Sequence, residues 1–234
     1  MINNIKRRIL PCAKIIKKCK GVKNRLSRLE AIWQKVFEMK WESVCHKSKA
    51  IAAVIVDEIG NIISVGRNKI GETEIPNPRV SHAEVEAVRN LDVSKYPNVK
   101  LYTLYAALEP CPMCLGTLVM GGIRKVIIGA HDDHGGAVEL LSKSNFLASK
   151  HVDVVWMPSL YGDVQRGLQT IKEILYNQDK EKLESMLDDF SVYNSHGVNA
   201  AKKLFEDGWF ENKTPDQYSI ECIFNELSRS IMTQ

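Results

Sequence analysis

The stretches His82-Ala83-Glu84 and Glu109-Pro110-Cys111-Pro112-Met113-Cys114 decide how the middle of this chain is expected to fold. Pro112 suits the first turn of a helix, because proline lacks an N–H and that position needs none. Cys111 and Cys114 are then three residues apart at a helix N-terminus, so both thiolates can face one metal ion. The helix dipole and the metal both favour the ionised thiolate. A metal site is therefore predicted where this helix begins.

The expected metal is one zinc ion per chain with an open coordination position. His82 is predicted at the start of another helix and can supply the third ligand, which leaves the fourth position for water. Zinc in such a site makes hydroxide near neutral pH. Glu84 is predicted to take a proton from that water, pass it to a substrate ring nitrogen and help ammonia leave. These residue types at this spacing predict hydrolytic deamination of an aromatic ring.

The same motifs allow other interpretations. Glu84 can be a capping carboxylate, with Ser81 three residues earlier as the other half of a capping box. A CxxC pair also occurs in redox sites, but a thioredoxin-like context is absent and a His-x-Glu precedes the pair. A closed structural zinc site would need a fourth protein ligand. The available fourth ligands are Cys45, His46, His131 and His134.

Hydrophobic patterning outside the motifs predicts an α/β fold with five strands. We expect strands over residues 50–57, 62–65, 99–108, 125–130 and 153–157, and helices over 27–45, after Ser81, and over 111–120 and 137–143. Beyond residue 161 only helices are expected, over 164–176, 180–190, 199–205 and 218–231. The first two strands should form a hairpin, and the long helix-containing connection before the last strand favours a parallel crossover.

The 234 residues are 44% hydrophobic and 26% charged, which is typical of a globular protein with one good core. No apolar run approaches the ~20 residues that a membrane-spanning helix needs, and we expect neither a signal peptide nor contact with a membrane. Six cysteines are too few for a disulfide framework, which favours a reducing cytoplasm.

Charge is distributed unevenly along the chain. Residues 1–49 contain fourteen Lys or Arg and three Asp or Glu, a net charge of +11, whereas residues 177–234 contain six and eleven, a net charge of −5. The basic head can contact phosphates, remain a solvated leader or dock on the acidic tail. Within it, residues 5–19 have apolar positions at helical spacing, which predicts a short amphipathic helix. We therefore divide the chain into a basic extension (1–26), a zinc deaminase domain (27–176) and an acidic helical extension (177–234).

Residues 50–157 resemble the cytidine deaminase-like superfamily of zinc deaminases, most closely the branch of tRNA adenosine deaminases, bacterial guanine deaminases and nucleoside deaminases. The two opening motifs carry the resemblance, and Gly66-Arg67-Asn68 and Gly129-Ala130-His131-Asp132 support it. It implies a three-layer α/β/α fold around a five-stranded mixed sheet whose strands four and five are parallel. This sheet agrees with the crossover expected from the sequence pattern.

The resemblance also implies residues that contact the substrate. Asn68 would hydrogen-bond the base or sugar, the backbone amide of Ala83 would contact the base, and Asp132 would line the mouth of the pocket. A turn asparagine and a solvated loop aspartate are the structural interpretations of Asn68 and Asp132. Residues 78–81 depart from the family pattern, and Arg79 among them can meet a phosphate or carboxylate bidentately or lie on the surface.

Three functions are compatible with these patterns. The first is a deaminase of a free purine nucleoside or nucleotide, converting adenine to hypoxanthine. The second is a tRNA or other nucleic-acid adenosine deaminase that uses the basic head as a phosphate-binding arm. A deaminase of guanine, cytosine or pterin-like rings is a separate alternative to both. The third is a non-catalytic interaction module. Related enzymes also imply a homo-oligomer, and the C-terminal helices offer a docking surface for a second copy or a protein partner.

Overall fold

The computed structural model describes residues 25–234, so the short basic helix predicted over 5–19 lies outside the described residues. Its centre is a five-stranded sheet in the order β2-β1-β3-β4-β5. The strands are β1 (Ala52–Val56), β2 (Ile62–Arg67), β3 (Thr103–Ala106), β4 (Lys125–Ile128) and β5 (Asp153–Trp156). β1 is antiparallel to β2 and to β3, whereas β3, β4 and β5 are parallel. The mixed sheet, the first hairpin and the parallel final strands are therefore confirmed.

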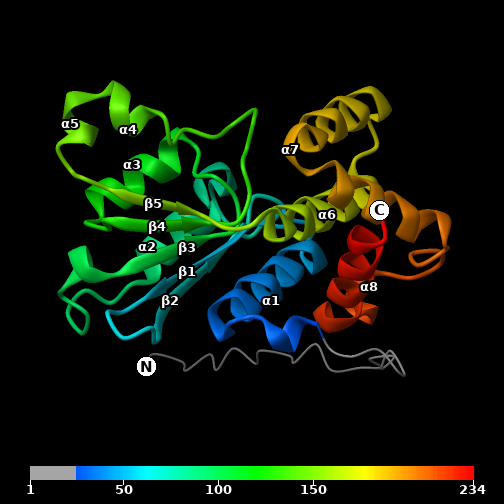
Figure 1. The fold of residues 1–234 in the computed structure, drawn as a ribbon, viewed down its shortest axis with the longest axis horizontal. Helices are drawn as coiled ribbons and strands as arrows, with labels where there is room; N and C mark the ends of the chain where they lie inside the picture. The colour runs from blue at the N-terminus through cyan, green and yellow to red at the C-terminus, as the bar shows by residue number, and fades with distance from the viewer. Residues whose placement is uncertain (1–24) are drawn as a thin grey trace, which may run out of the picture.

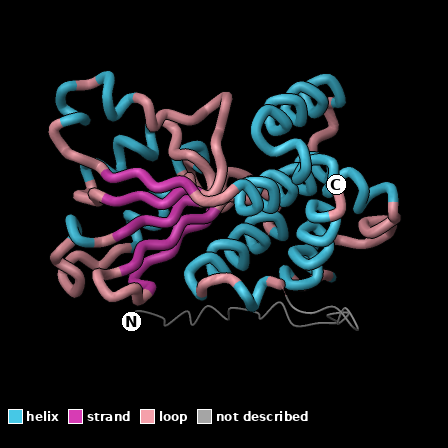
Figure 2. The backbone as a smooth tube through the Cα atoms, in the orientation of Figure 1, coloured by secondary structure: helices cyan, strands magenta, loops and turns pink. Residues whose placement is uncertain are grey.

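Helices cover both faces of this sheet (Figures 1 and 2). They are α1 (Ala31–Cys45), α2 (Ala83–Asn90), α3 (Pro112–Met120), α4 (Leu140–Lys143), α5 (Asn145–Ala148), α6 (Ser159–Tyr176), α7 (Lys180–Glu206) and α8 (Ile220–Met232). Short 3-10 helices span Leu26–Arg28, Pro78–Val80, Val99–Leu101 and Pro215–Gln217. None of these described helices combines the length and apolar character that crossing a membrane requires.

β1 separates the two parts of the core because its side chains alternate between the faces of the sheet. Val54 and Val56 pack with apolar residues of α1, α6, α7 and α8. Ala53 and Ile55 pack on the other face with residues of α2 and α3. All five residues of β1 are buried, which explains why the sequence shows an unbroken apolar run rather than alternation. The three-layer α/β/α architecture is confirmed.

The helices after β5 pack beside the sheet against α1 rather than forming a separate core (Figure 1). α6 and α7 cross at very close range, since a Cβ on Gly197 would lie 1.9 Å from the carbonyl oxygen of Asp163. Near this crossing Asn194 donates a hydrogen bond of 3.3 Å from Nδ2 to Oδ1 of Asp163. Asn194 has φ −135° and ψ 46°, which kinks α7. The helices predicted over 180–190 and 199–205 are therefore two halves of one kinked helix.

Two local predictions were wrong. Ser81 was expected to cap the second helix, but His82 is its N-cap residue and no side chain caps it, because Pro78–Val80 forms a 3-10 turn that ends at Ser81. The capping box of Ser81 with Glu84 is therefore absent, and Glu84 lies in the first turn instead. The third strand was expected over 99–108, but Val99–Leu101 is a 3-10 helix and only Thr103–Ala106 pairs in the sheet.

Candidate active site

Two helix N-termini meet at the edge of the sheet where β3 ends and the antiparallel β1 begins, and they bring the two motifs together. His82 is the N-cap residue of α2 and Cys111 the N-cap residue of α3, with Pro112 in the first turn. α2 can approach the sheet this closely because Gly66 of β2 has no side chain. A Cβ there would lie 2.1 Å from the carbonyl oxygen of Ala83 and 2.3 Å from the amide nitrogen of Ala87. Gly66 thus fixes the depth at which His82 and Glu84 sit.

His82, Cys111 and Cys114 have the separations of a metal site. Nδ1 of His82 lies 3.7 Å from Sγ of Cys111 and 3.5 Å from Sγ of Cys114. In a tetrahedral zinc site, sulfur and nitrogen ligands lie about 3.6 Å apart, given Zn–S of about 2.3 Å and Zn–N of about 2.0–2.1 Å. Among residues 25–234 these three form a His/Cys/Cys group whose ligand atoms all lie within 4.8 Å of one another. The donor set therefore fits zinc in type and spacing, with three protein ligands.

Glu84 lies beside this group without belonging to it. Its Oε2 is 3.2 Å from Sγ of Cys114, and its side chain is buried. Burial raises the pKa of Glu84 to about 7. The pKa of Cys111 is lowered to about 4, first by the hydrogen bond from Cys114 and also by His82. A carboxyl whose pKa lies near neutrality can both accept and donate a proton, which is what a proton shuttle requires.

Asn68 is held at the end of β2 by hydrogen bonds of both its backbone and its side chain. Its backbone N–H donates to Ile51 O at 2.9 Å, and its carbonyl accepts from Oγ of Ser43 at 3.1 Å. Its side-chain Oδ1 accepts from the amide of Ile70 at 3.1 Å. Oδ1 is thus occupied, while Nδ2 is buried and has no hydrogen-bond partner among residues 25–234. An amide in this state is prepared to donate to a ligand.

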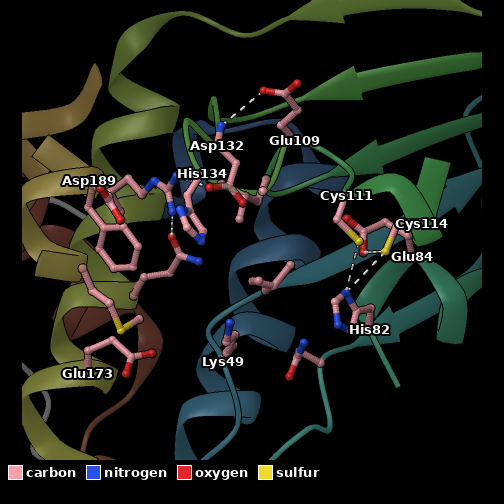
Figure 3. A pocket seen from close by; sticks show the side chains of 18 residues that line it. Lys49, His82, Glu84, Glu109, Cys111, Cys114, Asp132, His134, Glu173 and Asp189 are labelled. Atoms are coloured by element: carbon pink, nitrogen blue, oxygen red, sulfur yellow. Dashed lines mark hydrogen bonds and ion pairs between the residues drawn. The ribbon is translucent and has the colours of Figure 1, made fainter. Parts of the chain in front are cut away.

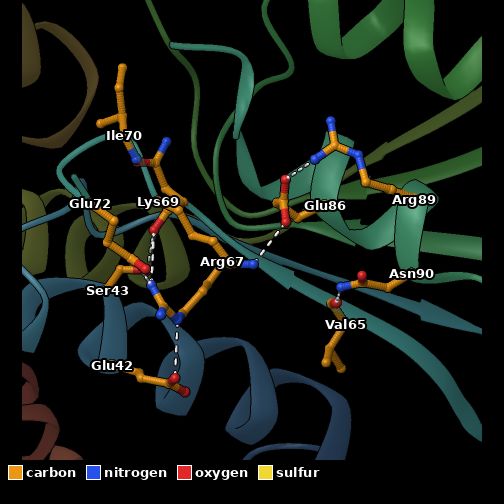
Figure 4. Close-up of polar contacts among 11 residues, drawn as sticks. Glu42, Ser43, Val65, Arg67, Lys69, Ile70, Glu72, Glu86, Arg89 and Asn90 are labelled. Carbon is orange, nitrogen blue, oxygen red and sulfur yellow. Dashed lines mark hydrogen bonds and ion pairs between the residues drawn. The ribbon is translucent and has the colours of Figure 1, made fainter. Parts of the chain in front are cut away.

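Ion pairs on both sides of Asn68 fix the chain there (Figure 4). Arg67 pairs with Glu42 of α1 and with Glu72 of the following loop. Glu86 of α2 accepts from Lys69 at 2.8 Å and from Arg89 at 2.7 Å. These pairs tie α1, the end of β2 and α2 together. The orientation of Asn68 is therefore set by elements from two layers.

Glu109 organises the loop that follows β4. Its carboxylate accepts from the amide of Asp132 at 3.2 Å and from the amide of Val138 at 3.1 Å. A Cβ on Gly136 would lie 2.4 Å from the carboxyl carbon of Glu109, so the loop wraps directly around this side chain. Glu109 thus supports Asp132 rather than facing the metal group.

These residues line a cavity of about 220 Å³ with two unlike walls. The metal wall consists of His82, Glu84, Cys111 and Cys114. The helical wall consists of Arg166, Gln169 and Glu173 from α6 and Met186, Asp189 and Phe190 from α7. Figure 3 shows Asp189 and Glu173 at the left of the cavity and the metal wall at the right. Asp132 and His134 lie above the space between these two walls, and Lys49 lies below it.

Arg166 anchors the helical wall. Its guanidinium donates to the carbonyl of His131 at 2.8 Å and to Oδ1 of Asp132 at 3.1 Å, and it lies 4.5 Å from the ring centre of Phe190. Burial lowers its pKa, and Asp132 is the first of the carboxylates that oppose this effect. Nη1 of Arg166 also donates to Oε1 of Gln169 at 2.7 Å.

Gln169 presents donors to the cavity. Its side chain is 5% exposed, and its Oε1 is taken by Arg166. Within the described part of the chain, the hydrogen bond of the Gln169 side chain is the one that Oε1 accepts from Arg166, and Gln169 lines the cavity. The amide orientation is therefore fixed with its N–H groups available to a ligand.

The predicted site residues fall into two groups. Asn68, Asp132, Glu84 and the three metal-type residues all line the cavity. Ala83 is buried in the first turn of α2, whereas Arg79 is exposed in the 3-10 turn before it and does not contribute to the lining. Of the alternative fourth ligands, His131 stacks on Trp156 at 3.7 Å between ring centres, and none joins the His/Cys/Cys group found among residues 25–234.

Sequence reasoning missed the helical wall. Arg166, Gln169 and Glu173 recur at positions i, i+3 and i+7, which places them on one face of α6. The opposite face carries Val164 and Leu168, so the pattern resembles an ordinary amphipathic helix with a solvated polar side. Only the packing of α7 over that polar side turns it into part of a pocket.

The fold and the site together define the class. A His/Cys/Cys group and a buried glutamate at two helix N-termini, on this five-stranded sheet, identify a cytidine deaminase-like zinc deaminase, as the sequence predicted. More particularly, the chain belongs to the MafB19-like deaminase family, whose model matches residues 28–167.

Individual proteins are similar over shorter regions. The tRNA-specific adenosine deaminase of Haemophilus influenzae is 37% identical over 90 residues, which are 38% of this chain and 50% of that protein. The tRNA-specific adenosine deaminase of Bacillus subtilis is 38% identical over 104 residues, 41% of this chain and 60% of that protein. The chain thus spans about half the length of such relatives. The solved structure of NE0047 in complex with 2,6-diaminopurine shares the fold, with a TM-score of 0.51 and 20% identity, over 68% of this chain and 86% of that one.

Proposed function

We propose that this protein is a zinc-dependent hydrolytic deaminase that converts adenine to hypoxanthine in a purine nucleoside or nucleotide. The observation that carries the proposal is the triangle of His82, Cys111 and Cys114 with the buried Glu84 at its side, inside a cavity. One zinc ion held by these three residues would supply an acidified water near neutral pH.

The residues around the metal group divide the remaining work. Glu84 would take one proton from the attacking water and deliver it to a ring nitrogen. It would then take the second proton from the oxygen now bonded to the ring and give it to the amine, which leaves as ammonia when the C–N bond breaks. Asn68 donates from Nδ2 to an acceptor on the base or sugar, since its Oδ1 is already occupied. Asp132, held by Glu109 and Arg166, lines the cavity mouth. In this assignment the Ala83 amide contacts the base, as it is expected to do in the superfamily.

One observation supports the choice of base and another the size of the substrate. Relatives at 37–38% identity are tRNA-specific adenosine deaminases by name, which favours adenine as the base and says nothing for a free nucleoside. The helical wall lies across the cavity from the metal group, and a cavity of about 220 Å³ is of a size to hold a small molecule.

Metal content and ammonia release test the proposal together. Zinc-loaded protein is incubated with adenosine, deoxyadenosine and cytidine, with the phosphates of these nucleosides, and with guanine. We expect ammonia from the adenine compounds. Glu84→Ala should keep one zinc per chain and lose activity, because Glu84 is not a ligand. Zinc-loaded protein that releases ammonia from none of these compounds would reject the function, and loss of zinc in Glu84→Ala would make the glutamate a ligand.

A nucleic-acid adenosine deaminase is the second candidate. The relatives are specific for tRNA by name, and residues 1–49 carry a net charge of +11. A polyanionic substrate would bind with a steep dependence on salt. Inosine formation in tRNA, together with that salt dependence, would favour this candidate over the first.

A further inference from the structure

A second pocket adjoins the cavity at the end of α6. This outer pocket has a volume of about 290 Å³ and shares Lys49, Glu173 and Met186 with the lining of the cavity. It is completed by Lys172 and Lys182, together with residues at the turn between α6 and α7. The cavity and the outer pocket are therefore immediate neighbours, with the side chains of Lys49, Glu173 and Met186 between them.

The outer pocket is positively charged. Lys49, Lys172 and Lys182 contribute three positive charges and Glu173 one negative charge, a net charge of +2. Glu173 is already paired, since both of its carboxylate oxygens lie 3.1–3.2 Å from Nζ of Lys172. Within the described part of the chain, neither Lys49 nor Lys182 forms an ion pair. Two ammonium groups therefore remain for an anion.

The acidic groups of the neighbouring cavity are engaged elsewhere. Asp132 accepts from Arg166, and Asp189 is among the carboxylates whose charge raises the pKa of that arginine. Carboxylates thus gather around Arg166 at one end of the cavity, while lysines gather at the other. Lys182 belongs to the stretch 177–234, whose net charge is −5, so the lysine cluster is a local feature and not part of a generally basic tail.

We propose that the outer pocket binds the phosphate of a mononucleotide whose base reaches the metal group. Lys49 and Lys182 hold the phosphate, and Gln169, which lines the cavity and has its Oε1 bound to Arg166, donates from Nε2 to an oxygen of the sugar between phosphate and base. A cluster of lysines around one pocket suits a single phosphate, whereas a nucleic-acid backbone is followed by a stripe of basic residues. This inference rests on the proposed deaminase function and narrows its substrate to nucleotides.

Paired substrates test the inference. Zinc-loaded full-length protein is assayed with adenosine against adenosine 5′-monophosphate, and likewise with the guanosine and cytidine pairs. We expect the kcat/KM of the nucleotide to exceed that of its nucleoside by about tenfold or more, the size of one good charge-assisted contact. In Lys49→Gln and Lys182→Gln this ratio should fall toward one. Lys203→Gln, at an exposed lysine of α7 remote from both pockets, is the matched control and should keep the ratio.

A binding measurement separates failure of this inference from failure of the proposed function. Glu84→Ala protein, loaded with zinc, is titrated calorimetrically with adenosine 5′-monophosphate and with adenosine. The phosphate site is supported if the nucleotide binds more tightly than the nucleoside and if this difference is lost when Glu84→Ala is combined with Lys49→Gln. This result would support the site even if the wild-type protein turns over none of the substrates. The inference would be overturned by equal affinity for the two ligands, or by a nucleotide-to-nucleoside ratio of kcat/KM that is unchanged in the lysine variants. A strong preference for a tRNA stem-loop over the mononucleotide would also overturn it.

Discussion

The two walls of the cavity are built in different ways. The metal wall consists of side chains in the first turns of two short helices, α2 and α3, whose positions follow from Gly66 and Pro112. The helical wall consists of side chains from the middle of two longer helices, which lie opposite only because α7 folds back over α6. The metal wall is therefore a local structure, whereas the helical wall is a product of tertiary packing. The first should determine the reaction and the second the substrate.

Removal of a metal ligand should have the largest effect. Cys111→Ala and Cys114→Ala should each lose zinc and activity, by more than the roughly 10–100-fold that loss of an outer-shell partner costs. Elemental analysis and ammonia release measure the two effects. Gln169→Glu, on the opposite wall, should keep its zinc. A cysteine variant with full zinc content and activity would show that the reaction does not depend on the metal wall.

A side chain at Gly66 should disturb the metal wall through the backbone. Gly66→Ala places a methyl group 2.1 Å from the carbonyl oxygen of Ala83, so α2 must move, at a cost of about 3 kcal/mol in the free energy of unfolding. Gly116→Ala on α3 is the matched control, because no atom lies within 4 Å of its added Cβ. It should be neutral or stabilise by about 0.5–1 kcal/mol. Urea unfolding compares the two, and equal stability would mean that α2 adjusts freely.

Gln169→Glu should alter substrate binding while leaving the reaction intact. The carboxylate can still accept from Arg166, but the N–H donors that face the cavity are lost. We expect KM to rise about tenfold and kcat to change much less, the signature of an interaction made equally in the ground state and the transition state. Steady-state kinetics measure the split. A large fall in kcat with constant KM would place Gln169 in the reaction itself.

The smallest effect is expected at Arg79. Its side chain is exposed and does not line the cavity, so Arg79→Ala should change kcat/KM for a mononucleotide by less than about twofold. The same variant assayed on tRNA sharpens the contrast between substrate classes. If Arg79→Ala lowers kcat/KM on tRNA by about tenfold, and if this loss becomes smaller at high salt, then Arg79 makes the phosphate contact that the sequence allows.

The metal wall could be predicted from the sequence because each of its residues is specified by its neighbours in the chain. Proline and cysteine spacing fixed the start of α3, and the apolar run of β1 indicated a strand buried on both faces. The cap of α2 could not be placed correctly, because the 3-10 turn at Pro78–Val80 displaced it by one residue. The helical wall could not be predicted at all, since the polar side of α6 becomes a binding surface only through contact with a distant part of the chain.

The kink at Asn194 separates two kinds of sequence within one helix. Met186, Asp189 and Phe190 lie before it and line the cavity, whereas Val198, Ala201 and Leu204 lie after it and are buried in the core. Substitutions of the three cavity-lining residues before the kink can therefore reshape specificity without loosening the fold. Substitutions of the three buried residues after it should lower stability without changing which substrate is preferred. A single bend makes the specificity of the proposed deaminase separately adjustable, by evolution and by design.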